Sequence, residues 1–466
     1  MYQWYIHPYL FGEKSYERTV IHTFLLIASY FFYMSWDYRF GGLILLSTVI
    51  DYFLAILISE AKSKEVSKYY LILSLFLNLV CILGFFKYYN FLSDSANLFL
   101  KDIGYSPLLP VLNVVLPVGV SFFTFQSLSY TIDVYRGVIP CEKSFIRFAL
   151  FVSFFPQLVA GPIVTAKSFI PQLFINHKIE DIPFRKAIRY FLMGYVKKIL
   201  ISDNIASVVD LIYKNPENYS TEAIWLGAIL FIIQLYCDFS GYTDMAYGSA
   251  LLLGYELPEN FRLPYLSINF TDFWRRWHLS LSIWIRDYIY FSLGGSKRGY
   301  FWHKFNLAFT MFLAGVWHGA NWTFFIWGFL QGIIMAFESI FYDYKEKLKI
   351  NKIPSKIRWI LGFIYFQFLF VSISMYFRAP TIEVAWLMQK KMFHYTDGIL
   401  RPYMIKYGAL AILTIAVFHY IGYLIYEKGK EYKISPVLEF SMYPILFLII
   451  ALFTSDNELP FVYFQF

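Results

Sequence analysis

Two histidines stand in the most apolar surroundings that this chain of 466 residues offers. His278 ends the segment DFWRRWH at 272–278, and His318 lies in AGVWHGANW at 314–322. An ionisable ring in a segment apolar enough to enter a bilayer costs free energy, so such a residue is more often functional than incidental. Histidine is also the usual proton-transfer residue near neutral pH. The pair therefore indicates a buried site that moves protons.

The segment around His278 suggests how its ring could be tuned. If 271–287 forms one helix, Asp272 and Arg276 lie four residues apart and can pair, and Arg275 lies one turn from His278. A nearby arginine favours the neutral imidazole, which is the form that a general base needs. A packed core histidine is an equally good interpretation, so we predict an assisting role: His278 positions a reacting group or polarises a carbonyl.

His318 is the stronger candidate because its neighbours are small. Glycines at 315 and 319 let a substrate or a second helix approach the ring, which lies beside Trp317. Asn321, three residues further on, could orient the imidazole or bind a carbonyl oxygen. The sequence has no G-x-S-x-G esterase motif, no HExxH or Cys/His cluster for a metal and no phosphate-binding glycine loop. This pattern favours metal-free acyl transfer with His318 as general base.

Polar residues also interrupt the apolar pattern through the middle third of the chain, at 232–322. Asp238 and Ser240 fall in one such stretch, and Arg275 and Arg276 in another. In lipid, such side chains must face a protein interior or a wet cavity, so we predict that they line an internal chamber and contact substrate. The alternative is a set of buried ion pairs that only orient helices.

The elements that position these residues are predicted to be membrane helices. The chain is 58% hydrophobic and 15% charged, against about 25% charged in a typical soluble protein. Apolar runs near 20 residues recur, the length that crosses a bilayer. The fold class is therefore all-α and polytopic, with about 10–12 membrane-associated helices, some of them broken. The candidate spans are 19–36, 40–59, 69–87, 111–131, 146–165, 221–237, 306–317, 322–341, 359–377, 406–426 and 438–454.

The net charge of +8 does not indicate nucleic-acid binding. Its basic residues gather in short loops, at 62–68, 345–358 and 427–433, as cytoplasmic loops do. The segment 178–205 alternates basic and apolar residues, which predicts an amphipathic helix at the membrane surface or a solvated helix face. The first 18 residues lack a continuous apolar core, so we expect no cleavable signal peptide. The three cysteines lie far apart, and we predict neither a disulfide nor a metal site.

Several of these motifs resemble those of the membrane-bound O-acyltransferase family, in its bacterial polysaccharide-modifying branch. The resemblance covers nearly the whole length and implies one membrane domain over 1–466. It is carried by LPVGVSFFTF at 116–125, FPQLVAGP at 155–162, QLYCDFSGYTD at 234–244, FWRRWH at 273–278 and WHG at 317–319.

The resemblance implies helices arranged around a central tunnel and a cytoplasmic acyl donor, with acetyl-CoA as donor substrate and no cofactor. His318 matches the histidine that the family places inside the tunnel, and His278 matches the second histidine of this branch. Members of the branch act in alginate acetylation, peptidoglycan O-acetylation and teichoic-acid D-alanylation.

The C-terminal tail at 456–466 gains a role from the same resemblance. On loop charge the last span runs outward, so the tail is expected on the extracytoplasmic side. It ends in FVYFQF, which resembles a terminal motif of this branch whose tyrosine is proposed to carry the acyl group. Here that residue is Tyr463. A phenol, with a pKa near 10, is easier to deprotonate than an aliphatic alcohol. The alternative is an aromatic anchor at the membrane interface.

The sequence thus predicts a multi-pass enzyme of a bacterial cytoplasmic membrane that exports acetyl groups. Acetyl would pass from acetyl-CoA, through His318 and Tyr463, to a separate extracytoplasmic esterase-like O-acetyltransferase. Peptidoglycan is the first choice of acceptor, alginate or a related exopolysaccharide the second, and D-alanyl transfer to teichoic acid a rival reaction. A transporter should show paired, similar halves, which the sequence lacks. A non-catalytic export scaffold would tolerate loss of both histidines.

Overall fold

The chain folds into helices joined by short connections. Its computed structural model describes residues 15–112, 114–159, 161–345, 347–348, 352–429, 435–454 and 461–462. Within those ranges each named element is helical, and the β pairing consists of two isolated bridges, Tyr219 with Ile399 and Phe261 with Trp277. The predicted all-α class is confirmed.

Seven helices of the described chain are long and apolar enough to cross a membrane, so the protein is a multi-pass membrane protein. They are Tyr38–Glu60 (α3), Lys64–Asp102 (α4, η2 and α5 in one run), Thr221–Leu252 (α12), Trp322–Asp343 (α16), Ser355–Arg378 (α17), Pro402–Tyr426 (α19) and Pro436–Phe453 (α20). A further apolar stretch, Arg18–Met34, is shorter. The predicted spans 111–131 and 146–165 fall on the shorter helices α6 (Val120–Tyr135) and α7 (Phe145–Ser153). The predicted span 306–317 lies within the 19-residue helix α15 (Tyr300–His318), which is not among these seven.

Contacts between residues divide the chain into two compact units. Unit 1 comprises Met1–Phe191 and Thr243–Pro258, and unit 2 comprises Leu192–Tyr242 and Glu259–Phe466. Two helices, α10 (Phe184–Val196) and α12, contribute residues to both units.

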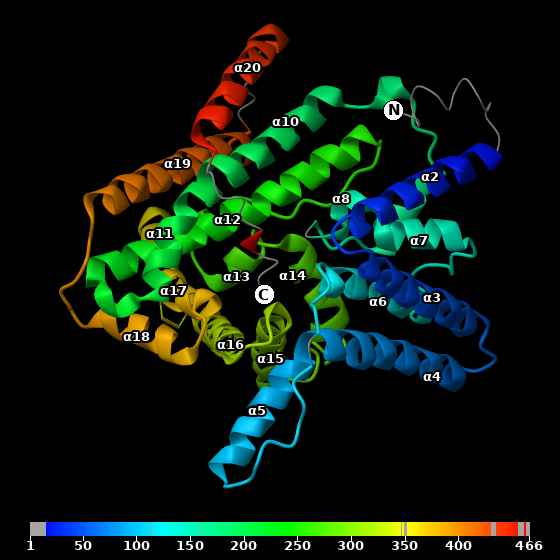
Figure 1. Ribbon diagram of the computed structural model, residues 1–466, viewed down its shortest axis with the longest axis horizontal. Coiled ribbons are helices and arrows are strands. Elements are labelled where there is room, and N and C mark those ends of the chain that lie inside the picture. Colours follow the sequence, from blue (N-terminus) through cyan, green and yellow to red (C-terminus); the bar gives the residue numbers. More distant parts are fainter. Residues whose placement is uncertain are drawn as a thin grey trace. The chain divides into compact units, whose positions relative to one another are not determined.

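In unit 1, α2 (Ser15–Met34) packs against α3 and α7 (Phe145–Ser153), and α3 packs against α6 (Val120–Tyr135) (Figure 1). The helix of 64–102 continues without a turn through a π-helical stretch, Phe76–Tyr88.

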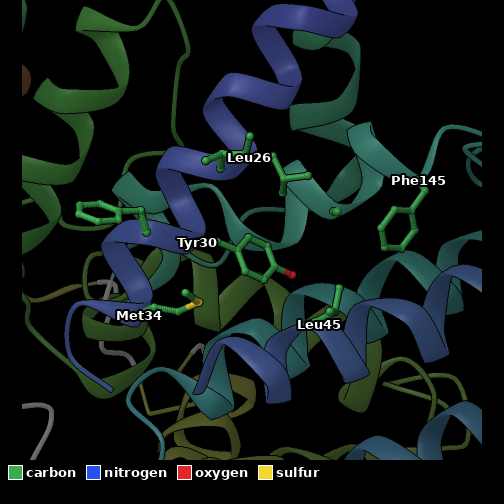
Figure 2. A pocket seen from close by; sticks show the side chains of 8 residues that line it. Leu26, Tyr30, Met34, Leu45 and Phe145 are labelled. Atoms are coloured by element: carbon green, nitrogen blue, oxygen red, sulfur yellow. The ribbon is translucent and has the colours of Figure 1, made fainter. Parts of the chain in front are cut away.

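A cavity of about 400 Å³ opens between α2, α3 and α7, lined by apolar side chains and Tyr30 (Figure 2). None of the predicted site residues lines it.

Two predicted spans of unit 1 are wrong at their ends. The span 111–131 begins only at Val120, because Gly119 is left-handed with φ 75° and stops the helix there. A side chain at Gly119 would also meet the carbonyl oxygen of Leu158, 2.8 Å from the new carbon. The span 146–165 ends at Ser153, because Phe154 leaves the helical conformation and α8 (Phe155–Leu158) starts afresh.

In unit 2, α15 (Tyr300–His318) and α16 pack extensively against each other and lie side by side (Figure 1). Gly315 makes this approach possible, since a Cβ atom there would lie 2.5 Å from the Cα atom of Gly328. Bare backbone at such a crossing is the usual way for membrane helices to pack closely. α16 also packs against α17 and against the short helix α13 (Phe270–Trp274).

The segment 271–287 is not the single helix that the sequence analysis considered. α13 ends at Trp274, the chain crosses a four-residue break, and α14 (Leu279–Ile285) begins after His278. The break is held by backbone pairing with a preceding segment: the Arg262 amide donates to the Arg276 carbonyl at 2.8 Å, and the Leu279 amide to the Asn260 carbonyl at 3.0 Å. Helical spacing therefore does not apply across the break.

Candidate active site

His318 is the last residue of α15 and is buried, with 5% of its surface exposed. Its imidazole lies edge to face with the rings of Trp327 at 5.2 Å and Phe377 at 5.1 Å between centroids. The next residue, Gly319, turns the chain toward α16, and a Cβ atom on it would lie 2.2 Å from the Phe324 ring. The glycine therefore lets the chain leave the helix directly at the histidine.

His278 is fully buried and occupies a left-handed backbone conformation, with φ 45° and ψ 53°. A residue other than glycine pays a steric cost there. The ring is fixed by Asn260, whose Oδ1 lies 3.2 Å from its Nδ1. Ser280 identifies that atom as oxygen, because both its backbone N–H, at 3.2 Å, and its hydroxyl, at 2.9 Å, donate to it.

This contact determines which nitrogen of His278 carries the proton. An amide oxygen only accepts, so the contact is a hydrogen bond when Nδ1 is protonated. The lone pair of the neutral ring is then on Nε2. Burial lowers the pKa of His278 to about 3, which keeps the ring neutral. The neutral form of His278 was predicted from the nearby charge of Arg275. Arg275 is exposed, and the lowered pKa of His278 comes from burial.

Both histidines contact the same tryptophan. The Trp317 ring lies 5.0 Å from that of His318 and 6.2 Å from that of His278, between centroids, and is itself buried. Phe239 of α12 packs edge to face on His278 at 4.7 Å. The structure thus brings together the two histidines that are 40 positions apart in sequence, in buried surroundings rich in aromatic rings.

The two predicted arginines lie away from this aromatic core. Arg276 pairs with Asp272 at 2.9 Å and with Glu427 at 3.1 Å. The pair with Asp272 was predicted, although Arg276 lies in the break after α13 and the two residues do not share one helix. Arg275 caps the end of α13 and is exposed. These contacts orient helices, which was the alternative interpretation of the polar residues in the middle third.

Asn321 and Ser240 have different surroundings. The Asn321 side chain caps α16: its Oδ1 accepts from the Thr323 amide at 3.1 Å, and its Nδ2 donates to the Pro380 carbonyl at 2.9 Å. Those bonds occupy the groups that were expected to orient the imidazole. Ser240 is fully buried on α12, and within the described chain its hydroxyl has no hydrogen-bond partner. A buried hydroxyl of this kind suits a substrate contact.

Asp238, on the same helix as Ser240, belongs to a buried charged cluster that α12 forms with the segment 198–203. Lys198 donates to Asp238 at 2.9 Å and to Asp203 at 2.8 Å, and all three side chains are less than a tenth exposed. Burial would lower the pKa of Lys198, but the Asp238 charge and the hydrogen bonds to both carboxylates raise it, so the amine stays charged.

The placement of Lys198 corrects the prediction for 178–205. A helix runs without interruption from Phe184 to Lys214, so the predicted helix is present, but it does not lie wholly at a surface. It comprises α10, a π-helical turn at Lys197–Ser202 and α11 (Asp203–Lys214). Lys198 lies in the π-helical turn and points into the protein, next to α12, where Gly241 permits a close crossing. A charge that lies inside the fold needs partners, and two carboxylates supply them.

Two buried imidazoles among aromatic rings can accept and return protons. The described residues contain no group of three or more His, Cys, Asp and Glu placed to hold a metal ion. Proton transfer and positioning of a reacting hydroxyl are the chemistry available from these side chains.

Comparison with known proteins agrees with this arrangement. The model of the MBOAT, membrane-bound O-acyltransferase family matches residues 31–377, a range that contains both histidines. The chain belongs to this family. It is therefore an O-acyltransferase, and the predicted resemblance is confirmed.

Three relatives show how far the similarity extends. The probable alginate O-acetylase of Pseudomonas putida is 36% identical over 98% of this chain and 96% of its own length. That of Pseudomonas aeruginosa is 41% identical over 83% of this chain and 71% of its own length. The peptidoglycan O-acetyltransferase of Helicobacter pylori is 34% identical over 79% of this chain and 73% of its own length.

Sequence reasoning missed two residues of the site. Asn260 lies 18 positions before His278 in a segment without a motif of its own, and only the backbone pairing of the two segments brings it to the ring. Lys198 appeared to be one of several surface lysines. Tyr463 and residues 456–460 and 464–466 of the predicted tail lie outside the described residues.

Proposed function

We propose that this enzyme takes acetyl groups from cytoplasmic acetyl-CoA and supplies them for O-acetylation of an exported polysaccharide of the alginate type. The observation that carries the proposal is the pair of buried histidines joined through Trp317 in a membrane-bound O-acyltransferase. The similarity to a probable alginate O-acetylase over 98% of the chain supports the acceptor. This similarity favours alginate or a related exopolysaccharide, the second acceptor predicted from the sequence, over peptidoglycan, which was the first.

The chemical step balances without any added reagent. A neutral imidazole takes the proton from the acceptor hydroxyl as its oxygen attacks the thioester carbonyl. The tetrahedral intermediate collapses, the carbon–sulfur bond breaks, and the imidazolium returns its proton to the departing coenzyme A thiolate. The products are an acyl ester and free coenzyme A.

We assign the base to His318 and the positioning of the acceptor to His278. In the neutral His278 ring the proton is on Nδ1, where Asn260 accepts it. The ring then has no second N–H to polarise a thioester carbonyl, so of the two predicted assisting roles positioning is favoured. Nε2 can accept a hydrogen bond from the hydroxyl that is about to react, which aims the oxygen at the carbonyl carbon.

The proposed acceptor is Tyr463 of the C-terminal tail. Its acetyl ester would pass to a separate extracytoplasmic esterase-like O-acetyltransferase, and the protein would lie in a bacterial cytoplasmic membrane with its tail outside. The reactivity of a phenyl ester supports this relay, because a phenolate leaves more readily than an alkoxide when a sugar or serine hydroxyl attacks.

The test is a labelling experiment with membrane vesicles that contain the full chain. Incubation with acetyl-labelled acetyl-CoA, in the absence of the partner, should place label on Tyr463, and Tyr463→Phe should abolish it. Tyr395→Phe removes an exposed tyrosine of unit 2 and is the matched control. Label that persists in Tyr463→Phe would reject the tyrosyl carrier.

The acceptor is tested in cells by removing the gene and analysing both polymers. Loss of O-acetyl groups from an exopolysaccharide, with peptidoglycan unchanged, is the expected result. Loss of O-acetyl groups from peptidoglycan alone would show that peptidoglycan is the acceptor. Loss of D-alanyl esters from teichoic acid would show that the enzyme transfers D-alanyl groups instead of acetyl groups.

A further inference from the structure

The last described residues of the chain, Phe461–Val462, lie on the buried charged cluster of Lys198, Asp203 and Asp238. The Val462 amide donates to Oδ2 of Asp238 at 2.9 Å. The Phe461 ring lies under the Lys198 ammonium at 4.6 Å and edge to face with Tyr242 at 4.7 Å. Val462 is buried, with 5% of its surface exposed. We call Lys198, Asp203 and Asp238 the tail-docking cluster.

The charges of the cluster explain why this segment binds there. One ammonium faces two carboxylates, which leaves an excess of negative charge inside the protein. Oδ1 of Asp238 accepts from Lys198, and among the described residues the donor to Oδ2 is the Val462 amide. A buried carboxylate oxygen without a donor is costly. The segment supplies that donor, and its aromatic ring adds a cation–π contact to the lysine.

The docking position lies at the depth of the histidine site. Asp238 is the eighteenth residue of the 32-residue helix α12, about 26 Å from its start at a rise of about 1.5 Å per residue. Its neighbour Phe239 packs on His278, which contacts Trp317 as does His318. An aromatic interfacial anchor would instead lie near a helix end.

We propose that Lys198 and Asp238 are positioning residues that hold Phe461–Val462 inside unit 2, beside the histidine site. Phe461–Val462 forms the attachment, and the residue that follows in the sequence is Tyr463. The attachment itself is independent of the acyl relay. Its consequence, efficient delivery of the Tyr463 hydroxyl to the reacting thioester, rests on the proposed function.

The attachment is tested by thiol accessibility in the full-length protein. Val462→Cys preserves the backbone N–H that binds Asp238, and it is made after the three native cysteines are replaced by alanine. Labelling by a water-soluble maleimide should be slow. Asp238→Asn or Lys198→Met should raise the labelling rate at least tenfold, while Lys198→Arg, which keeps the charge, should restore slow labelling.

Lys304→Met is the matched control, because Lys304 is another buried lysine of unit 2 and pairs with Asp343 at 2.5 Å. Its labelling rate should equal that of the parent. Equal rates in Asp238→Asn, Lys198→Met and the parent would overturn the docking proposal. So would an equal rise in Lys304→Met, because the effect would then be general loosening of unit 2.

The delivery step is tested with Val462 intact. Asp238→Asn should lower the acetylation of Tyr463 at least tenfold while the KM for acetyl-CoA stays within twofold, because the proposed role of the cluster is to hold the segment and not to bind the donor. Unchanged acetylation in this variant would overturn the positioning role. If Tyr463 takes no label even in the parent, the acyl relay fails, and the thiol-labelling result still decides whether the segment docks.

Discussion

Asn260 offers the sharpest test of how the site is organised. Its Oδ1 receives three contacts: the Nδ1 of His278 and the amide and hydroxyl of Ser280. Asn260→Ala removes this acceptor without adding charge. The His278 ring would then lose the contact that favours the Nδ1 proton, and the reactive nitrogen would no longer be fixed as Nε2.

The expected magnitude follows from the burial of these groups. Leaving a buried hydrogen-bonding group without its partner costs about 1–3 kcal/mol. A cost of about 1.36 kcal/mol in the transition state slows a reaction tenfold. If the whole cost of the lost contact falls on the transition state, acetyl transfer should slow by about fivefold to 150-fold. The KM for acetyl-CoA should change little, because the contact orients a side chain and binds no donor.

The assay is acetyl transfer from labelled acetyl-CoA in vesicles, divided by the amount of folded protein. Asn306→Ala is the control, since Asn306 is also a buried asparagine of unit 2 and donates to the Gly295 carbonyl at 2.9 Å, away from both histidines. It should transfer at the parent rate per folded molecule. A rate within twofold of the parent in Asn260→Ala, or an equal loss in Asn306→Ala, would refute the reasoning.

Two further changes test the packing that holds the site. Gly315→Ala places a carbon 2.5 Å from the Cα atom of Gly328 and should separate α15 from α16. Both the thermal midpoint of unfolding and the rate of acetyl transfer should therefore fall. The control is Gly42→Ala, which has open space around the added carbon and should change neither quantity. Lys391→Met removes an ammonium that donates to three backbone carbonyls, those of 216, 217 and 219, at 2.7–3.0 Å. It should lower the thermal midpoint by several degrees and leave the transfer rate per folded molecule unchanged, and an undisturbed midpoint would contradict the buried-donor argument.

Local sequence patterns were sufficient to predict the long membrane helices and the burial of His318. A run of apolar residues dictates a buried helix wherever the backbone must satisfy its own hydrogen bonds in lipid. The glycines beside His318 indicated a close crossing, and Gly315 makes one with Gly328. These features depend on residues that are near one another in the chain, so the sequence contains them directly.

Features that depend on distant partners could not be predicted. The break after Trp274 exists because 260–262 pairs with 276–279, and that pairing gives no periodic signal. Lys198 has the same spacing as a surface lysine, and only the crossing of α12 at Gly241 turns it toward Asp238. Asn321 donates to the Pro380 carbonyl and Arg276 pairs with Glu427. Both partners are far away in the sequence, so these contacts could not be predicted.

The most direct test of the account is transfer of labelled acetyl from acetyl-CoA by the full-length protein with His318 replaced. His318→Ala should reduce transfer at least a hundredfold, within the range that general base catalysis contributes, while the protein remains folded and binds acetyl-CoA. His318→Ala vesicles that acetylate as fast as the parent would contradict the claim that His318 is the base of this enzyme.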